Sequence, residues 1–160
     1  MQKTARRASS STRPPGLAAV SVALGLCVLA GPAAASQVLT ISHAWLRFLT
    51  PQIPAAGYFT LHNSGQHAAV LTGATSPDCG KLMLHKSVVH NSSASMQMVA
   101  DVIVPPNGSV TFQPGGYHLM CVSPTPAIAP GQSVPVSLLF KDGSTVAATF
   151  PVYGAKGKQG

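Results

Sequence analysis

Glycine and proline interrupt this chain so often that a fold built on long helices is excluded. The 160 residues include 15 Gly and 14 Pro, most of them after residue 36. Proline removes a backbone donor and glycine carries a high conformational entropy cost, so both mark the ends of regular elements. The segments between them alternate apolar and polar residues, and none shows a 3.6-residue period. We therefore predict an all-β protein.

The alternating segments are short and regularly spaced. We expect strands over residues 37–42, 44–48, 57–63, 68–74, 80–86, 96–104, 109–113, 117–122, 133–140 and 144–152. Asn107-Gly108 and Asp142-Gly143 each lie between two apolar runs, which is the sequence pattern of a tight β-hairpin. Many short strands with frequent turns favour a single-domain β-sandwich or a related Greek-key barrel.

The first 35 residues have the three-part composition of a secretory signal. Four cations without an acid precede an apolar run of 14 residues, Leu17 to Ala30, and small residues end at Ala35. We expect cleavage near Ala35 and export to the periplasm, with an uncleaved anchor as the alternative. The apolar run is short for a membrane span, so no stable membrane insertion is expected after cleavage. This leaves a folded domain over residues 36–153 and a flexible tail over 154–160.

Export features are also present at Arg6-Arg7 and Cys27. The arginine pair is typical of twin-arginine export, but the residues that follow it do not fit that signal well. Cys27 is preceded by Leu26, whereas a lipidation site needs a small residue there. We expect Cys27 to leave with the signal.

Charge excludes two classes of function. The whole chain carries a formal charge of +7, but four of its ten Lys and Arg precede residue 36. The remaining six are offset by three aspartates, so the expected mature chain has a formal charge of only +3. It has no run of basic residues of the kind that binds nucleic acid. With three acids in the chain, paired-carboxylate or Asp-assisted catalysis has few residues to use, so we expect no enzyme.

Two cysteines remain after the signal, Cys79 and Cys121. In an oxidising compartment an even pair indicates a disulfide. It would close a loop of about 40 residues and contribute roughly 3–4 kcal/mol in the chain-entropy model. The alternative is that Cys121 is a free metal ligand, because it directly follows Met120.

Two histidines and two methionines form the chain's most informative pattern, with the spacing His85-x10-Met96-x21-His118-x-Met120. Imidazole and thioether are soft, neutral ligands, and such a set favours Cu(I). His118 and Met120 share one face of a strand, because side chains two residues apart point the same way. A hairpin would bring His85 near Met96. Taken singly, each residue is as well explained by ordinary packing, and Met83 and Met98 have the same strand parity as the predicted ligands.

The segments that carry this pattern resemble a known family. Gly80-Lys81-Leu82-Met83-Leu84-His85, Met96 and Pro114-Gly115-Gly116-Tyr117-His118-Leu119-Met120 are similar to the periplasmic copper chaperone family PCuAC. Ala44-Trp45-Leu46-Arg47, Ala56 to Leu61, Asn63-Ser64-Gly65 and Val136 to Phe140 fit the same family. The family motif often has Met directly after its first His, and here Lys86 occupies that position.

The resemblance implies a cupredoxin-like β-sandwich that binds one Cu(I) through His85, Met96, His118 and Met120. It also implies delivery of copper toward the CuA centre of cytochrome c oxidase subunit II, with Sco-type assembly factors as further partners. Two alternatives remain at this point. An electron-transfer cupredoxin needs a cysteine thiolate, which Cys121 alone could supply near the motif. A metal-free β-sandwich binding module would make the His and Met residues incidental.

Overall fold

The computed structural model describes residues 39–158 with the exception of Ser92, and the predicted signal lies outside this range. The strands are β1 (Leu39–Arg47), β2 (Ala55–Asn63), β3 (Ala69–Thr75), β4 (Cys79–His90), β5 (Ser93–Met98), β6 (Val102–Val104), β7 (Gly108–Phe112), β8 (Tyr117–Pro124), β9 (Ser133–Phe140) and β10 (Thr145–Tyr153). In the described part of the chain, no helix is long and apolar enough to cross a membrane. The prediction of an all-β fold is confirmed.

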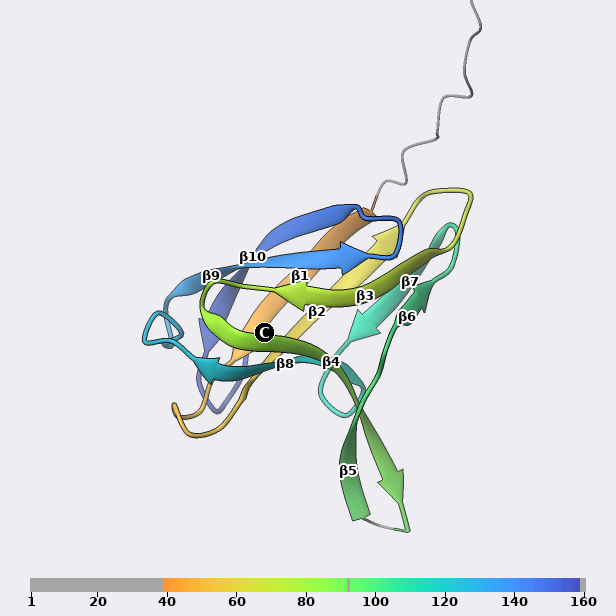
Figure 1. Ribbon diagram of the computed structural model, residues 1–160. Coiled ribbons are helices and arrows are strands. Elements are labelled where there is room, and N and C mark those ends of the chain that lie inside the picture. The colour runs from red at the N-terminus through yellow and green to blue at the C-terminus, as the bar shows by residue number, and fades with distance from the viewer. Residues whose placement is uncertain (1–38, 92, 159–160) are drawn as a thin grey trace, which may run out of the picture. The chain divides into compact units, whose positions relative to one another are not determined.

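The ten strands form two layers that are joined at one edge (Figure 1). The first layer has the strand order β5-β4-β8-β7-β2-β1, and the second has the order β10-β9-β3-β6. A short parallel pairing of β1 with β10, at Leu46↔Val152 and Arg47↔Tyr153, connects them. β5 and β6 are therefore the edges, and β4 and β8 lie inside the first layer.

The core between the layers is built from the inward-facing residue of each alternating pair. Phe59 and Phe112 stack across β2 and β7 with ring centroids 4.3 Å apart, and Phe150 meets Phe59 edge-on at 5.8 Å. These three rings are at most 1% exposed. Aromatic pairs in such arrangements contribute about 0.5–1.5 kcal/mol beyond their buried area. The three rings pack the first layer, which also contains β4 and β8, against the second layer.

The start of the fold differs from the prediction of two strands over 37–42 and 44–48. β1 is one strand with a bulge, since its register against β2 shifts between Ser42 and Trp45. His43 within the bulge has φ 53°, the left-handed conformation that lets an extra residue fit into a strand. The bulge restores the alternation, so Leu46 reaches the core.

The expected strand over 96–104 and the expected hairpin at Asn107-Gly108 are both wrong. β5 pairs with β4 in the first layer, β6 pairs with β3 in the second, and β7 returns to β2 in the first. Between β5 and β7 the chain thus crosses from the first layer to the second and back. The strands on either side of Asn107-Gly108 lie in different layers, so they cannot pair with each other across the turn, although Asn107 has the positive φ of 50° that turns favour. Pro105 and Pro106 before it also cannot donate to a ladder.

The second expected hairpin is confirmed. β9 and β10 pair antiparallel, and Gly143 takes φ 83° in the turn between them. The Asp142 carboxylate accepts hydrogen bonds from the backbone N–H and the hydroxyl of Ser144, at 2.9 and 2.6 Å. These bonds hold the pKa of Asp142 below its usual value.

The beginning of the predicted tail forms a turn. The Gly157 N–H donates to the Gly154 carbonyl at 2.9 Å, and Gly157 has φ 69°. A Cβ at this position would lie 3.1 Å from the Trp45 ring, so the backbone packs closely on the indole.

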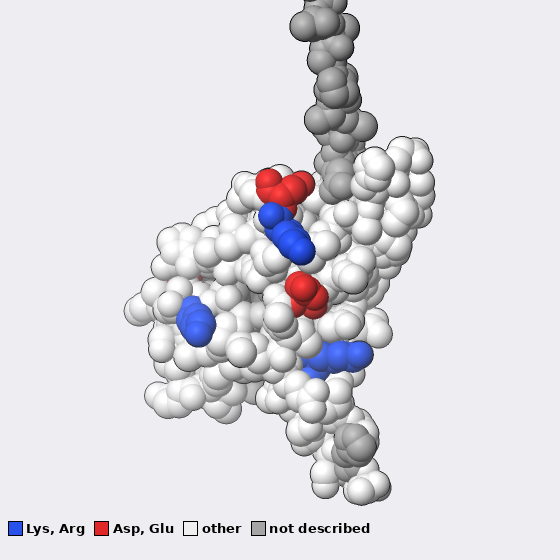
Figure 2. All heavy atoms as spheres, turned by 45° about the vertical axis from the view of Figure 1, so that its right-hand side comes forward, with Lys and Arg blue, Asp and Glu red and all other residues white. Residues whose placement is uncertain are grey.

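Figure 2 shows one face of the molecule, where the Lys and Arg side chains are separated by uncharged surface. No continuous basic patch appears on that face, in agreement with the low mature charge.

Candidate metal centre

Three neighbouring strands bring the predicted ligands to one face of the first layer. His118 on β8 lies directly opposite His85 on β4, and their ring centroids are 5.9 Å apart. Met120 lies opposite Met83 two residues further along the same pair. Because directly opposed residues point to the same face, all four side chains leave the sheet on the side away from Leu82, Leu84, Leu119 and Cys121 in the core.

A tight turn before β8 orients His118. Gly116 N–H donates to the Gln113 carbonyl at 2.9 Å, and Gly115 has φ 79° in that turn, a conformation that glycine adopts readily. The Gly116 carbonyl then lies 3.2 Å from His118 Nδ1. A carbonyl can only accept, so Nδ1 carries the proton in the neutral ring and Nε2 keeps its lone pair. This is the arrangement that presents a histidine to a metal.

His85 is buried, at 9% exposure, and its Nδ1 has no hydrogen-bond partner. A buried polar atom without a partner is costly, and native structures contain few of them. Burial lowers the pKa of His85, and the neighbouring His118 lowers it further. Both effects keep the imidazole neutral, the form that binds a metal. A ligand at this position would satisfy the atom that the protein leaves unpaired.

The sulfur ligands belong to a pocket of about 240 Å³ beside the histidine pair. Three of the four predicted ligands line it, namely Met96, His118 and Met120, and His85 adjoins it through His118. Sequence reasoning missed the rest of the wall, which comes from β1, β2 and the loop between them, from β4, and from the turn before β8. These lining residues are Arg47, Leu49, Ile53, Pro54, Ala55, Ala56, Tyr58, Ser87, Pro114 and Gly115.

Tyr58 and Arg47 are the largest polar groups of that part of the wall. Tyr58 is 4% exposed and packs on Trp45 at 4.6 Å between ring centroids. Burial raises the pKa of Tyr58, and the charge of Arg47 opposes this. Neither residue belongs to the ligand spacing, so no sequence signal placed them at the pocket.

The predicted hairpin between His85 and Met96 exists, but its register differs from the simplest expectation. Met98 lies opposite His85, and Met96 lies opposite Ser87, two pairs further out. The two strands pair as far as His90 and Ser93, so most of the segment between His85 and Met96 is paired strand. Met96 and Met98 are 63% and 70% exposed, in contrast to the two buried histidines.

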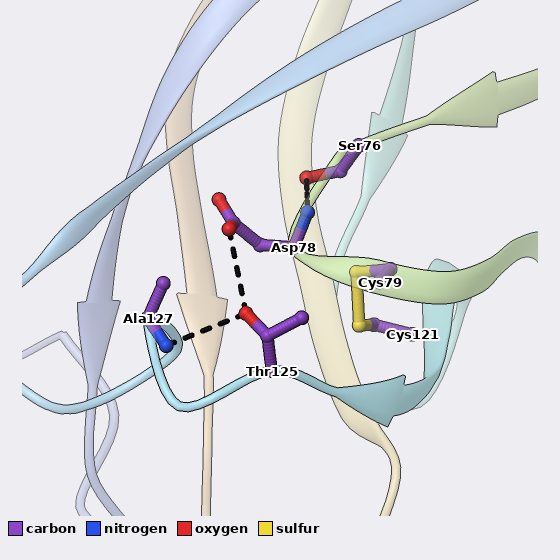
Figure 3. The surroundings of a disulfide bond; sticks show 6 residues. All are labelled: Ser76, Asp78, Cys79, Cys121, Thr125 and Ala127. Carbon is purple, nitrogen blue, oxygen red and sulfur yellow. Dashed lines mark hydrogen bonds between the residues drawn. A yellow bond between two sulfur atoms is a disulfide. The ribbon is translucent and has the colours of Figure 1, made fainter.

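A disulfide joins Cys79 to Cys121, as the even cysteine count predicted (Figure 3). It ties the start of β4 to β8 across a separation of 42 residues. Beside it the Thr125 hydroxyl donates to the Asp78 carboxylate at 3.4 Å, and the Thr125 N–H donates to the Asp78 carbonyl at 2.9 Å. Cys121 faces the core and has no thiolate to offer. The alternative of a Cys121 metal ligand, and with it a blue-copper centre at this residue, is excluded.

Lys86, the departure from the PCuAC motif, does not face the histidines. Its neighbour His85 points to the opposite face, because successive residues of a strand alternate. The Lys86 ammonium lies 5.0 Å from the centroid of the Tyr117 ring, in cation–π geometry. This charge is therefore held outside the pocket.

The donor set of this region is nitrogen and thioether sulfur. Among residues 39–158, Ser92 aside, no group of three or more His, Cys, Asp or Glu gathers that could hold a metal ion without thioether ligands. Carboxylate-rich sites for hard cations and thiolate sites are thus both unsupported in the described chain. Neutral soft donors favour a monovalent soft ion.

Comparison with known proteins places the chain in a family. The family model described as "Putative lipoprotein LpqE-like" matches residues 39–152, which is the whole sandwich. The chain belongs to the LpqE-like family. A relative named "Putative lipoprotein Lxx21020", from Leifsonia xyli subsp. xyli, is 30% identical to this LpqE-like protein over 159 residues, which cover 95% of this chain and 93% of the relative.

Solved structures connect this LpqE-like protein to PCuAC domains. The copper-bound PCuAC domain from PmoF2 has 25% identity and a TM-score of 0.60, covering 72% of this chain and 92% of that one. The Cu(I) form of DR1885 from Deinococcus radiodurans has 27% identity and a TM-score of 0.59, covering 76% and 83%. The resemblance to PCuAC is thus supported by structure, whereas the matching family carries another name. The cupredoxin-like β-sandwich is confirmed.

Proposed function

We propose that this LpqE-like protein is an exported Cu(I) carrier that holds one copper ion with His85, Met96, His118 and Met120. The observation that carries the proposal is the opposed pair of buried histidines beside a pocket lined by two methionines. One histidine has its Nδ1 fixed by a carbonyl, and the other has a buried Nδ1 without a partner. The copper-bound PCuAC domain and Cu(I)-DR1885, which have a similar fold, support copper as the bound ion.

The donor chemistry suits an ion that must be carried and released. Thioethers stay uncharged and unprotonated over the physiological range, so only the imidazoles compete with protons for copper. Thioether ligands also avoid the oxidation of thiols outside the cytoplasm. Bound by four neutral ligands, Cu(I) keeps a charge of only +1, which is less costly at a partly buried site than the +2 of Cu(II). The role is therefore binding and transfer rather than catalysis.

The experiment is an anaerobic Cu(I) titration of the mature protein against a competing chromophoric chelator. Replacing both Met96 and Met120 by Leu keeps the side-chain volume and removes two ligands, so affinity should collapse. Met83→Leu is the matched control, since Met83 lies on the same face opposite Met120 and should leave affinity unchanged. A loss with Met83→Leu, or none with the double variant, would contradict the ligand set.

Delivery is the second part of the proposal. The acceptors that we propose are the CuA site of cytochrome c oxidase subunit II and Sco-type assembly factors, the partners of the family that the sequence resembles. Mixing the Cu(I) protein with a soluble CuA domain should transfer copper, visible as the CuA absorption after oxidation. If both proteins keep their starting metal content, another acceptor is needed.

Export to the periplasm is the third part. The basic and apolar leader supports it, and so do the lipoprotein names of the family and of its relative. Leu26 before Cys27 argues against lipid attachment there, and we propose cleavage near Ala35. The mass of the mature protein tests this, because a chain beginning near Ser36 and a diacylated chain beginning at Cys27 differ by many residues and a lipid.

A further inference from the structure

Met98 occupies a position that the four-ligand set does not explain. β5 is the edge strand of its layer, and Met98 lies directly opposite His85. Met98, His85 and His118 therefore form one row across β5, β4 and β8, with Met98 at the outer end. Met96 lies two pairs further out but reaches the pocket, whereas Met98 does not line it.

The backbone holds Met98 in this row. The next residue, Val99, donates its N–H to the Leu84 carbonyl at 3.0 Å and packs against the core. Met98 is thus tied to the residue beside His85, although its own side chain is 70% exposed. Figure 1 shows the end of β4 and β5 projecting as a two-stranded hairpin beyond the other strands.

Packing does not account for this methionine. A side chain that is 70% exposed buries little apolar area, so it contributes little to stability. All six residues of β5 are exposed, so no inward-facing neighbour requires an apolar residue there. A thioether at the solvent end of a row that continues into two histidines is accessible both to an incoming donor and to His85.

We propose that Met98 is an entry and exit ligand, which takes part in copper transfer but not in the resting site. The inference rests on the proposed Cu(I) function. Copper arriving from a donor first binds the Met98 sulfur and His85. It then moves inward as bonds to His118, Met96 and Met120 form and the bond to Met98 breaks. Release follows the same steps in reverse. Copper stays Cu(I), the thioether stays neutral, and no electron or proton is exchanged.

The test separates rate from equilibrium. Cu(I) bicinchoninate serves as the donor, and excess free bicinchoninate as the acceptor, in stopped-flow mixing with the mature protein. Met98→Leu should slow uptake and removal several-fold, with a smaller change in Kd, because a group used only during transfer affects both directions alike. Met96→Leu should instead weaken Kd, chiefly through faster removal.

Gln97→Leu is the matched control, since it adds an apolar side chain to the same strand on the opposite face and should match the wild type. The inference is overturned if Met98→Leu has the rates of Gln97→Leu. It is also overturned if Met98→Leu weakens Kd as much as Met96→Leu does, because Met98 would then be a resident ligand. If the wild-type protein takes up no Cu(I), the proposed function itself fails.

A second measurement does not depend on a variant. With methyl-labelled methionine and copper at a fraction of one equivalent, exchange between free and loaded protein should broaden the Met98 methyl signal as well as those of Met96 and Met120. An unperturbed Met98 methyl signal would overturn the inference.

Discussion

The two proposed nitrogen ligands and the two methionines of β5 are held in opposite ways. His85 and His118 are 9% and 5% exposed, and they lie on β4 and β8 inside the first layer, next to a disulfide. Met96 and Met98 are 63% and 70% exposed, on an edge strand that pairs with β4 alone among the described strands. The core fixes the histidines and the strand β8 that also carries Met120, whereas Met96 and Met98 lie on an arm, residues 87–98.

The difference shows how one site can bind copper and still release it. A preformed pair of imidazoles gives a fixed geometry, so little order must be gained when copper binds. Thioethers on an exposed arm can leave the ion one at a time, because few packing contacts oppose their movement. Affinity then depends mainly on the body of the sandwich, and exchange depends mainly on the arm.

Amide hydrogen exchange should show the largest contrast between the two regions. Amides of the arm should exchange on the order of 10³-fold faster than those of β8, because they open locally while β8 opens only with the core. Cu(I) should slow exchange in the arm and change β8 little. Equal protection of β5 and β8 in the apoprotein would remove the basis of the comparison.

Loss of the disulfide should lower the stability of the sandwich, which holds His85 and His118. Replacing Cys79 and Cys121 by Ala should lower the free energy of unfolding by about 4 kcal/mol, since the bond closes a long loop in the unfolded chain. Urea unfolding measures this. Reduction of the wild-type protein is the control and should give a similar loss, while exchange in the arm should stay fast in every case.

A pair of glycine substitutions separates stability from orientation of the site. Gly115→Ala and Gly143→Ala each place a Cβ in open space at positive φ, so both should cost about 1–2 kcal/mol. Gly115 is in the turn that positions His118, whereas Gly143 is in the β9–β10 hairpin. Only Gly115→Ala should also weaken Cu(I) binding. Equal affinities in the two variants would show that the turn does not orient the ligand.

The smallest effect should be the pH dependence of the apoprotein. Burial and then His118 lower the pKa of His85 below its ordinary value of 6.5, so between these values the unfolded state binds more protons than the folded one. Stability from this residue is therefore complete above pH 6.5 and declines as pH falls toward the folded pKa. An NMR titration of the His85 ring should give a midpoint below 6.5. A midpoint at or above that value would contradict the burial argument.

Much of the fold could be predicted because the strand pattern is local. Alternation and turn residues located eight of the ten strands approximately, and Asp142-Gly143 specified its hairpin, since a two-residue period and a positive φ are properties of neighbouring residues. The prediction failed where the layers mattered. Residues 96–104 look like one strand, yet Val99 to Asp101 carry the chain from one layer to the other. Asn107-Gly108 likewise marks a turn between layers rather than within one.

The placement of the proposed ligands on one face could also be predicted from residue spacing, because His118 and Met120 must share a face and a hairpin must bring β5 back to β4. Spacing alone did not predict which methionine lies opposite His85, or how deeply each of these side chains is buried. Those properties depend on which strands are edges.

By itself, then, the amino-acid order determined the strands, the cysteine pair and the soft, neutral character of the donors, all of which follow from side-chain chemistry and short-range geometry. Only the tertiary structure decided that β4 and β8 are interior neighbours while β5 is an edge. That arrangement buries the imidazoles and exposes the two sulfurs of β5, because exclusion of water depends on contacts between residues far apart in the chain.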